Sequence, residues 1–106
     1  DRVISSVAEV LKNTAREIDN AFRFGGEEFI VLLDGTDSAG AARAAERIRQ
    51  RIAHLHPDKL ELTQTITVSI GCATLQAKES VSELTERADS AMYQAKSGGR
   101  NCVRAA

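Results

Sequence analysis

The sequence predicts an α/β sandwich, a layered domain built from both helices and strands. Three segments carry apolar residues at helical spacing, and short β-prone runs lie between and after them. Their order is helix, hairpin, helix, strand, helix, strand, which suits helices packed on a sheet. With 106 residues, 42% apolar and 27% charged, the chain has the size and composition of one globular domain.

The first helix is predicted over residues 1–15, with Asp1 as a possible N-cap. Its apolar positions recur at helical spacing: Val3, Ile4, Val7, Val10 and Leu11. A short strand is expected over 21–23, and the pair Gly25-Gly26 then predicts a tight hairpin between two β-prone pieces. The returning strand, 28–33, hardly alternates in polarity and is therefore predicted to be buried on both faces.

The second half of the chain predicts two more helices and two more strands. The second helix carries arginines on its outer side and ends at residues 56–58; its apolar face is Ala41, Ala44, Ala45, Ile48, Ile52 and Leu55. A strand is expected over 66–75, with Gly71 at a bulge or close approach. The third helix, with Tyr93 in the core and Gly98-Gly99 as C-cap, has the apolar residues Val81, Leu84, Ala88, Ala91, Met92 and Ala95. A last strand is predicted over 101–104.

Composition limits the partners and the compartment. The formal net charge of −1 gives no reason to expect nucleic acid or direct membrane contact. Cys72 and Cys102 lie in strand-like apolar sequence and are predicted to be buried free thiols, which fits a reducing cytoplasm. The chain begins at Asp1 and shows no signal peptide. We expect it to be a piece of a longer parent protein, which could be anchored in a membrane. His54 and His56 lack metal-binding partners at suitable spacing and are expected at the surface.

The residues most suggestive of chemistry are Gly25-Gly26-Glu27-Glu28-Phe29. Glycines let another molecule approach the backbone closely, and two adjacent carboxylates suit a hard cation that carries a polyphosphate. These five residues resemble the signature of the GGDEF family, the diguanylate cyclases that make cyclic di-GMP from two GTP. Three flanking segments resemble the family in the same order: Arg16-x-x-Asp19, Thr67-Val-Ser-Ile-Gly71, and residues 87–101. The resemblance spans residues 1–106 but lacks the family's N-terminal strand and helix.

The resemblance implies a nucleotidyl cyclase or palm-like fold, with helices around a mixed, mainly antiparallel sheet. It implies a homodimer in which each domain binds one GTP with Mg²⁺ or Mn²⁺. Glu28 would be a metal ligand, and Glu27 a metal ligand or the proton acceptor near the attacking 3′-hydroxyl. Other residues would bind substrate: Gly25 and Gly26 by leaving room, Lys96 and Arg100 at the phosphates, and Asp1 and Ile4 at the guanine. An inhibitory, allosteric site for the product cyclic di-GMP would use Arg16, Asp19 and Arg47.

Each of these residues also has an ordinary structural interpretation. The paired glutamates suit a solvated hairpin, and Lys96 and Arg100 suit the negative end of a helix dipole. Asp1 suits a capping role at a frayed terminus, and Arg16 with Asp19 an intrahelical ion pair. Arg87 and Asp89 are expected to fasten the third helix to its neighbours.

Three functions follow from these interpretations. The first is a diguanylate cyclase. The second is a GGDEF module that binds cyclic di-GMP or GTP as a receptor without turnover. The third, an unrelated ferredoxin-like interaction domain, would leave the agreement of four motifs to chance.

Overall fold

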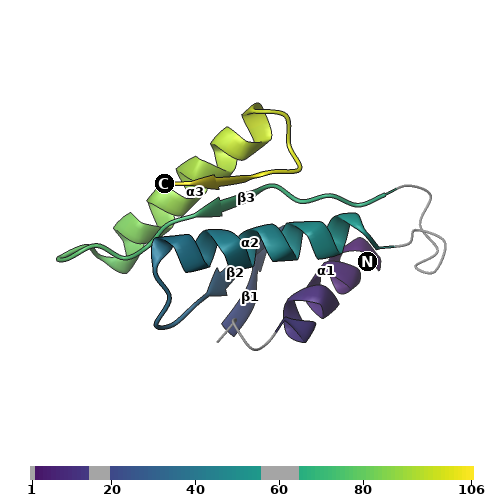
Figure 1. Ribbon diagram of the computed structural model, residues 1–106, viewed down its shortest axis with the longest axis horizontal. Helices are drawn as coiled ribbons and strands as arrows, with labels where there is room; N and C mark the ends of the chain where they lie inside the picture. Colours follow the sequence, from purple (N-terminus) through teal and green to yellow (C-terminus); the bar gives the residue numbers. More distant parts are fainter. Residues whose placement is uncertain (1, 15–19, 56–64) are drawn as a thin grey trace.

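A computed structural model describes residues 2–14, 20–55 and 65–106 of the chain (Figure 1). Asp1 and residues 15–19 and 56–64, which include Arg16, Asp19 and His56, lie outside the described residues. The elements run in the predicted order: α1 (Arg2–Asn13), β1 (Asn20–Gly25), β2 (Glu28–Leu32), α2 (Ser38–Ala53), β3 (Ile70–Cys72), α3 (Val81–Ser97) and β4 (Val103–Ala105). The α/β class predicted from the sequence is therefore confirmed.

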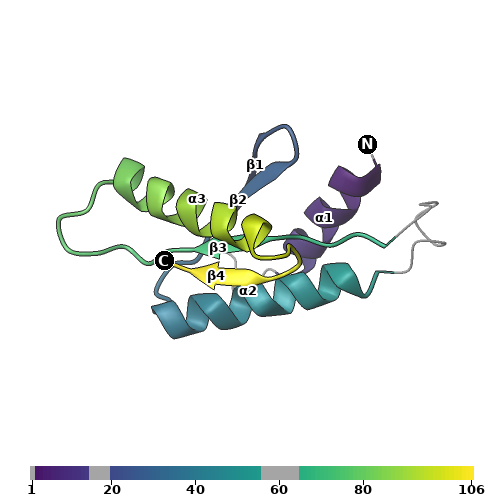
Figure 2. The same cartoon turned by 90° about the horizontal axis from the view of Figure 1, so that it is seen from above.

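The described strands form two pairs. Strands β1 and β2 are antiparallel, and β3 and β4 are parallel with α3 as the crossover between them. The β3–β4 pair lies between α3 on one face and α2 on the other, as Figure 2 shows from above. In the same view the β1–β2 hairpin and α3 lie on one side of α2, whereas Figure 1 shows them on opposite sides of that helix. Helix α2 thus carries the β3–β4 layer on one part of its surface and packs against α1 with another.

The core that joins the first helix to the rest is aliphatic. Its buried residues are Val7, Val10 and Leu11 of α1 and Ile48 and Ile52 of α2. Half-buried side chains of β2, of the residue after it and of the segment before β3 pack against it, among them Phe29, Val31, Leu33, Ile66 and Val68. The helical periodicity that predicted α1 and α2 therefore marks the faces that these helices bury.

Strand β2 is not buried on both faces, contrary to the prediction. Phe29, Val31 and Leu33 contact the core, whereas Leu32 is 48% exposed. Successive side chains of a strand point to opposite faces, so only every second residue of β2 reaches the core. The unbroken apolar run concealed this alternation. β3 is also shorter than the predicted 66–75, because its parallel partner β4 has only three residues with which to pair.

Helix α3 begins and ends with strong capping signals. Ser80 Oγ accepts from the Glu83 N–H at 3.1 Å, and the Glu83 carboxylate accepts from the Ser80 N–H at 3.1 Å. At the other end Gly98 is the C-cap and Gly99 has a φ of +117°, as the glycine pair predicted. The capping box, Ser-x-x-Glu, was readable in the sequence and would have fixed the first residue of α3.

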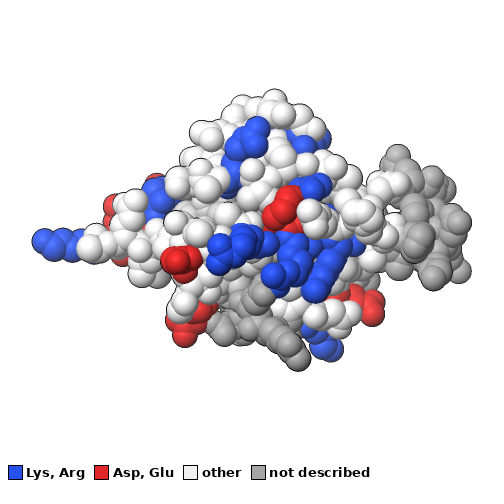
Figure 3. Space-filling view, in the orientation of Figure 1, with Lys and Arg blue, Asp and Glu red and all other residues white. Residues whose placement is uncertain are grey.

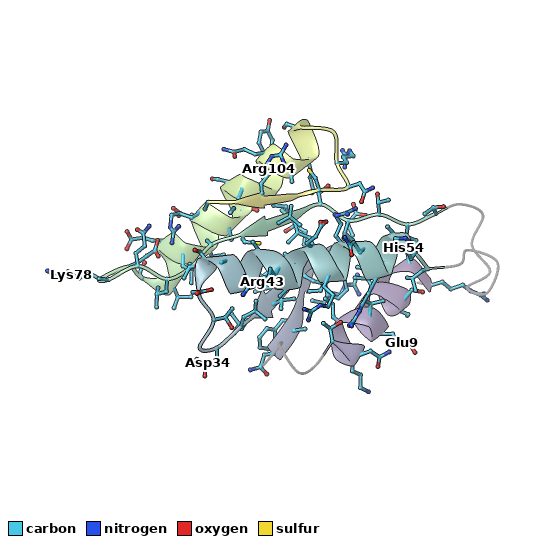
Figure 4. The ribbon with its side chains drawn as sticks, in the orientation of Figure 1. Glu9, Asp34, Arg43, His54, Lys78 and Arg104 are labelled. Carbon is cyan, nitrogen blue, oxygen red and sulfur yellow. The ribbon has the colours of Figure 1, made fainter. Side chains whose placement is uncertain are left out.

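Tyr93 is not in the core, contrary to the prediction, but is 71% exposed. Helix α3 turns Ala91 and Ala95 inward, and a residue two positions from each lies on the opposite side of the helix. Cys72 and Cys102 are free thiols, half-buried rather than fully buried. His54 is exposed at the C-terminal end of α2, as predicted (Figure 4).

Alanines suit the inner face of α3 because the helix approaches β3 very closely at Gly71. A Cβ built on Gly71 would lie 2.2 Å from the Ala88 carbonyl oxygen and 2.2 Å from the Met92 nitrogen. Both are backbone atoms of the helix, so neither can move aside as a side chain would. The close approach that the sequence suggested for Gly71 is confirmed, and only glycine fits there.

Gly71→Ala is expected to destabilise the fold by at least about 3 kcal/mol, because the added methyl group forces α3 away from β3. Urea unfolding of the intact protein measures this. Gly35→Ala is the matched control, since the Cβ site of Gly35 is open and only its φ of +60° opposes alanine. That strain is worth about 1–2 kcal/mol. Equal losses in the two variants would contradict a steric limit at Gly71.

Candidate active site

The tip of the β1–β2 hairpin presents an open glycine turn. Gly25 and Gly26 have φ angles of +149° and +54°, and no atom lies within 4 Å of a Cβ placed on either. The Arg23 guanidinium donates two hydrogen bonds to the Gly26 carbonyl oxygen, at 2.7 and 3.0 Å. The turn is therefore closed by its own side chain, and the space above both glycines is free.

The paired carboxylates follow this turn directly. Glu28 starts β2, where it is half-buried and pairs with Gly25 across the hairpin, while Glu27 is exposed at the tip. Both glutamates directly follow the open glycines in the chain, so they border a space that a ligand can enter.

The cations predicted to bind phosphates lie at the C-terminal end of α3. Lys96 is half-buried in the last turn of the helix, and Arg100 is exposed just beyond it. Figure 1 shows the hairpin and α3 on opposite sides of α2, although both lie on one side of that helix in the view of Figure 2. None of the hydrogen bonds or ion pairs of the described residues joins Glu27 or Glu28 to Lys96 or Arg100. The acidic and basic groups thus form two separate clusters, one at the hairpin and one at the end of α3.

The residues predicted for guanine and for the allosteric site are only partly described. Asp1, Arg16 and Asp19 lie outside the described residues. Ile4 is half-buried on α1, and Arg47 is exposed on α2. Lysine and arginine side chains gather over α2 in Figure 3. On this helix Arg43, Arg47 and Arg51 are exposed at four-residue spacing. Arg47 therefore belongs to a longer basic face, which confirms the arginines predicted for the outer side of this helix.

The glutamate pair fits part of a divalent metal site. Within the described residues, no group of three or more His, Cys, Asp or Glu side chains is placed to hold a metal ion. Mg²⁺ is commonly held by one or two carboxylates together with water and substrate phosphates. Glu27 and Glu28 supply ligands of the right chemistry, and a nucleotide would supply the rest.

A polar contact that the sequence analysis missed links α2 to the turn after α3. Arg49 Nη1 donates to Asn101 Oδ1 at 2.8 Å, and Arg49 Nε donates to the Glu46 carboxylate. Asn101 has a φ of +46° and follows Arg100 directly. An asparagine next to a Gly-Arg pair was a readable sign of a left-handed turn, but its partner 52 residues away was not.

Arg87 fastens the segment before α3, as predicted. Its Nε lies 2.6 Å from Glu79 Oε2, and its Nη2 donates to the Thr74 carbonyl oxygen at 2.6 Å. The hydrogen bond from Arg87 lowers the pKa of Glu79 to about 2, with a further contribution from the Gln76 N–H. Asp89 is exposed on α3, and no hydrogen bond or ion pair among the described residues involves its side chain, so the fastening role predicted for it is not seen. The Arg87–Glu79 pair borders a shallow hollow also lined by Glu83 and Glu86, whose acidic surface does not suit a nucleotide.

Comparison with known proteins identifies the chain. The family model for the diguanylate cyclase GGDEF domain matches residues 1–102. The chain belongs to the GGDEF family. Diguanylate cyclase DgcM of Escherichia coli K12 is 43% identical over 106 residues, which are all of this chain and 25% of DgcM. The GGDEF chain thus spans about a quarter of the length of this relative.

Solved GGDEF structures share the fold. The coiled coil and GGDEF domain of DgcB from Caulobacter crescentus, in complex with c-di-GMP, aligns with a TM-score of 0.85 at 34% identity. That alignment covers 98% of this chain and 56% of the DgcB chain. The active GGEEF domain of a Vibrio cholerae diguanylate cyclase aligns with a TM-score of 0.81 at 30% identity, over 97% and 65% of the two chains. The Vibrio motif is spelled as in this GGDEF chain, with glutamate at both acidic positions.

Glu79→Gln is expected to lower stability near neutral pH and to lose this effect in acid. The folded pKa of about 2 lies below the ordinary 4.5, so the stabilisation is complete above about pH 4.5 and disappears as pH falls towards 2. Urea midpoints of wild type and variant, measured from pH 6 to pH 2 (roughly one-unit steps), should converge at the acid end. In an Arg87→Met background the gap should be smaller, because only the hydrogen bond from the Gln76 N–H remains. A gap that does not change with pH would refute this linkage.

Proposed function

We propose that this domain gives its protein diguanylate cyclase activity, the condensation of two GTP into cyclic di-GMP and pyrophosphate. The observation that carries the proposal is the open Gly25–Gly26 turn with Glu27 and Glu28 at its edge. Membership of the GGDEF family and the likeness to diguanylate cyclases support it. The chemistry needs oxygen ligands for a cation, room for a nucleotide and cations for its phosphates, and these residues are suited to each need.

The roles of the residues follow from their chemistry. Gly25 and Gly26 leave space for the nucleotide. Lys96 and Arg100 neutralise its phosphates, and the planar guanidinium can hold two oxygens at once. Glu27 accepts the proton of the attacking 3′-hydroxyl as a P–O bond forms at the α-phosphorus and the bond to pyrophosphate breaks. Asp1 accepts from the N–H groups of guanine, with Ile4 beside the base.

Glu28, with Glu27, would hold a divalent metal ion, either Mg²⁺ or Mn²⁺. When bound, such an ion neutralises phosphate charge and lowers the pKa of a coordinated hydroxyl. The half-buried position of Glu28 at the start of β2 suits a ligand that must keep a fixed direction. Exposed Glu27 suits a group that exchanges a proton.

The reaction needs two copies of the domain. Each holds one GTP, and the 3′-hydroxyl of each nucleotide attacks the α-phosphate of the other, so the two sites must face one another. A homodimer with twofold symmetry provides this arrangement. The hairpin lies at the surface with both glycines open, and this exposure is compatible with a facing partner.

Product binding is assigned to a second, allosteric site formed by Arg16, Asp19 and Arg47. Arginine can chelate the O6 and N7 atoms of guanine or a phosphate, and aspartate accepts from the guanine edge. The basic face of α2 around Arg47 suits an anionic dinucleotide. The DgcB structures, solved in complex with c-di-GMP, add support from relatives.

The free, half-buried thiols of Cys72 and Cys102 support a reducing compartment such as the cytoplasm. Among the described residues, no helix is long and apolar enough to cross a bilayer.

A receptor without turnover is the second candidate function. It is favoured by the metal-ligand count, since the described residues provide two adjacent carboxylates and no third ligand near them. Such a module would bind cyclic di-GMP or GTP and report the binding to the rest of the protein. Turnover and product binding are separable measurements, and product binding without turnover in the intact protein would favour the receptor.

Glu28→Ala is expected to abolish cyclic di-GMP synthesis from GTP and Mg²⁺ by the intact protein, with a fall of roughly 100-fold or more. Chromatography of the products measures it. Glu86→Ala removes the same charge from the exposed side of α3 and should keep activity. Synthesis that survives in Glu28→Ala would remove this residue from the site. A wild-type protein that makes no product would favour the receptor.

Arg16→Ala is expected to weaken cyclic di-GMP binding by roughly tenfold or more, because charged hydrogen bonds to the ligand are lost. Calorimetry measures the affinity, and turnover in the presence of added product should become insensitive to it. Lys78→Gln is the control, because Lys78 projects from the loop before α3 (Figure 4). Unaltered product affinity in Arg16→Ala would exclude this allosteric site.

A further inference from the structure

The turn that follows α3 has a strained backbone. Gly99, Arg100 and Asn101 have φ angles of +117°, +63° and +46°. Glycine adopts such angles freely and asparagine tolerates them, whereas an arginine held there suffers a clash between Cβ and the backbone. Strain of this kind persists only where the surrounding structure fixes the chain, and it is found disproportionately at ligand sites. Arg100 therefore needs contacts that keep it in this conformation.

The structure shows such contacts on both sides of Arg100. The Arg100 N–H donates to the Ala95 carbonyl oxygen at 3.0 Å, which ties the turn to the last residues of α3. On the other side, Asn101 Oδ1 accepts from Arg49 Nη1 at 2.8 Å. Arg49 is itself oriented by Glu46, whose carboxylate accepts from Arg49 Nε. A chain of polar contacts thus runs from α2 to the residue next to Arg100.

Arg49 is poorly placed to bind a ligand itself. Its side chain is 20% exposed, and its Nε and Nη1 donors are directed to Glu46 and Asn101. Arg100, in contrast, is exposed beyond the end of α3. The arginine that holds the turn and the arginine that can reach a ligand are therefore different residues.

We propose that Arg49 and Asn101 are positioning residues that hold Arg100 ready for the triphosphate of GTP. The inference rests on the proposed function, in which Arg100 contacts those phosphates. Contacts on both sides of Arg100 fix its backbone and hence the direction of its Cα–Cβ bond. Without the Arg49 contact, Arg100 leaves the left-handed region, and each binding event must order it again. Lys96 needs no such support, because regular helix already fixes its backbone.

The test is a double-mutant cycle on nucleotide affinity in the intact protein. Calorimetry with a non-hydrolysable GTP analogue and Mg²⁺ measures binding without turnover. Arg100→Met should weaken binding by roughly tenfold or more, as the loss of a charge-assisted hydrogen bond does. Arg49→Met should weaken it by roughly three- to tenfold in the wild-type background. In the Arg100→Met background its effect should shrink below about twofold, because the two residues act as a unit.

Three control variants separate positioning from charge and from general stability. Lys12→Met removes an exposed cation from α1 and should leave the affinity for the analogue unchanged. Asn101→Asp keeps an acceptor for Arg49 and the tolerance for a positive φ, and should retain affinity. Asn101→Leu loses both and should match Arg49→Met. It breaks the contact from the opposite side, so it completes the cycle if Arg49→Met fails to fold.

Hydrogen exchange of the Arg100 amide gives a readout that does not involve nucleotide. Exchange should be faster in Arg49→Met, because the bond from Arg100 to Ala95 opens more often. If exchange is unchanged, or if Arg49→Met weakens binding equally in both backgrounds, the positioning role is overturned while the proposed function stands. If wild type and Arg100→Met bind the analogue equally, or neither binds it, the assignment of Arg100 to the phosphates fails, and the inference fails with it.

Discussion

The direct contact between β3 and α3 at Gly71 is the constraint on which the C-terminal half of the fold depends. The strand passes so close to the backbone of Ala88 and Met92 that no side chain fits between them. This approach fixes the height of α3 above the β3–β4 pair and explains why Ala91 and Ala95 form its inner face. It therefore also fixes the position in space of the C-terminal end of α3, and with it the positions of Lys96 and Arg100. The location of the cationic cluster is thus a consequence of backbone packing.

The acidic and basic clusters are held by different parts of the fold. Glu27 and Glu28 lie on a hairpin whose β2 strand rests on the aliphatic core of α1 and α2. Lys96 and Arg100 belong to the β3–α3–β4 unit on the other side of α2. Helix α2 contacts this unit directly, and Arg49 extends the contact to the turn beside Arg100. The relative placement of the two clusters accordingly depends on α2, although none of its residues is assigned to direct contact with the metal ion or GTP.

Local signals in the sequence predicted the fold well, whereas long-range contacts escaped it. The Gly25-Gly26 turn, the three helices and the Gly98-Gly99 C-cap each depend on neighbouring residues, and all are present. Tyr93 was misplaced although it is two positions from both Ala91 and Ala95, which by helical periodicity puts it opposite the inner face of α3. The burial of β2 was overestimated because its apolar residues face both ways. The partners of Arg49 were unpredictable, since Asn101 is 52 residues distant and no local pattern joins them.

The two hydrogen bonds from Arg23 to the Gly26 carbonyl give the hairpin tip a further property. They connect residues three apart in the chain, so the bend is braced by its own strand rather than by the remainder of the domain. Its conformational entropy is consequently lost when the protein folds, before any visiting molecule arrives. A loop that is already ordered loses little further conformational entropy on binding, so the ordering cost falls mainly on the ligand.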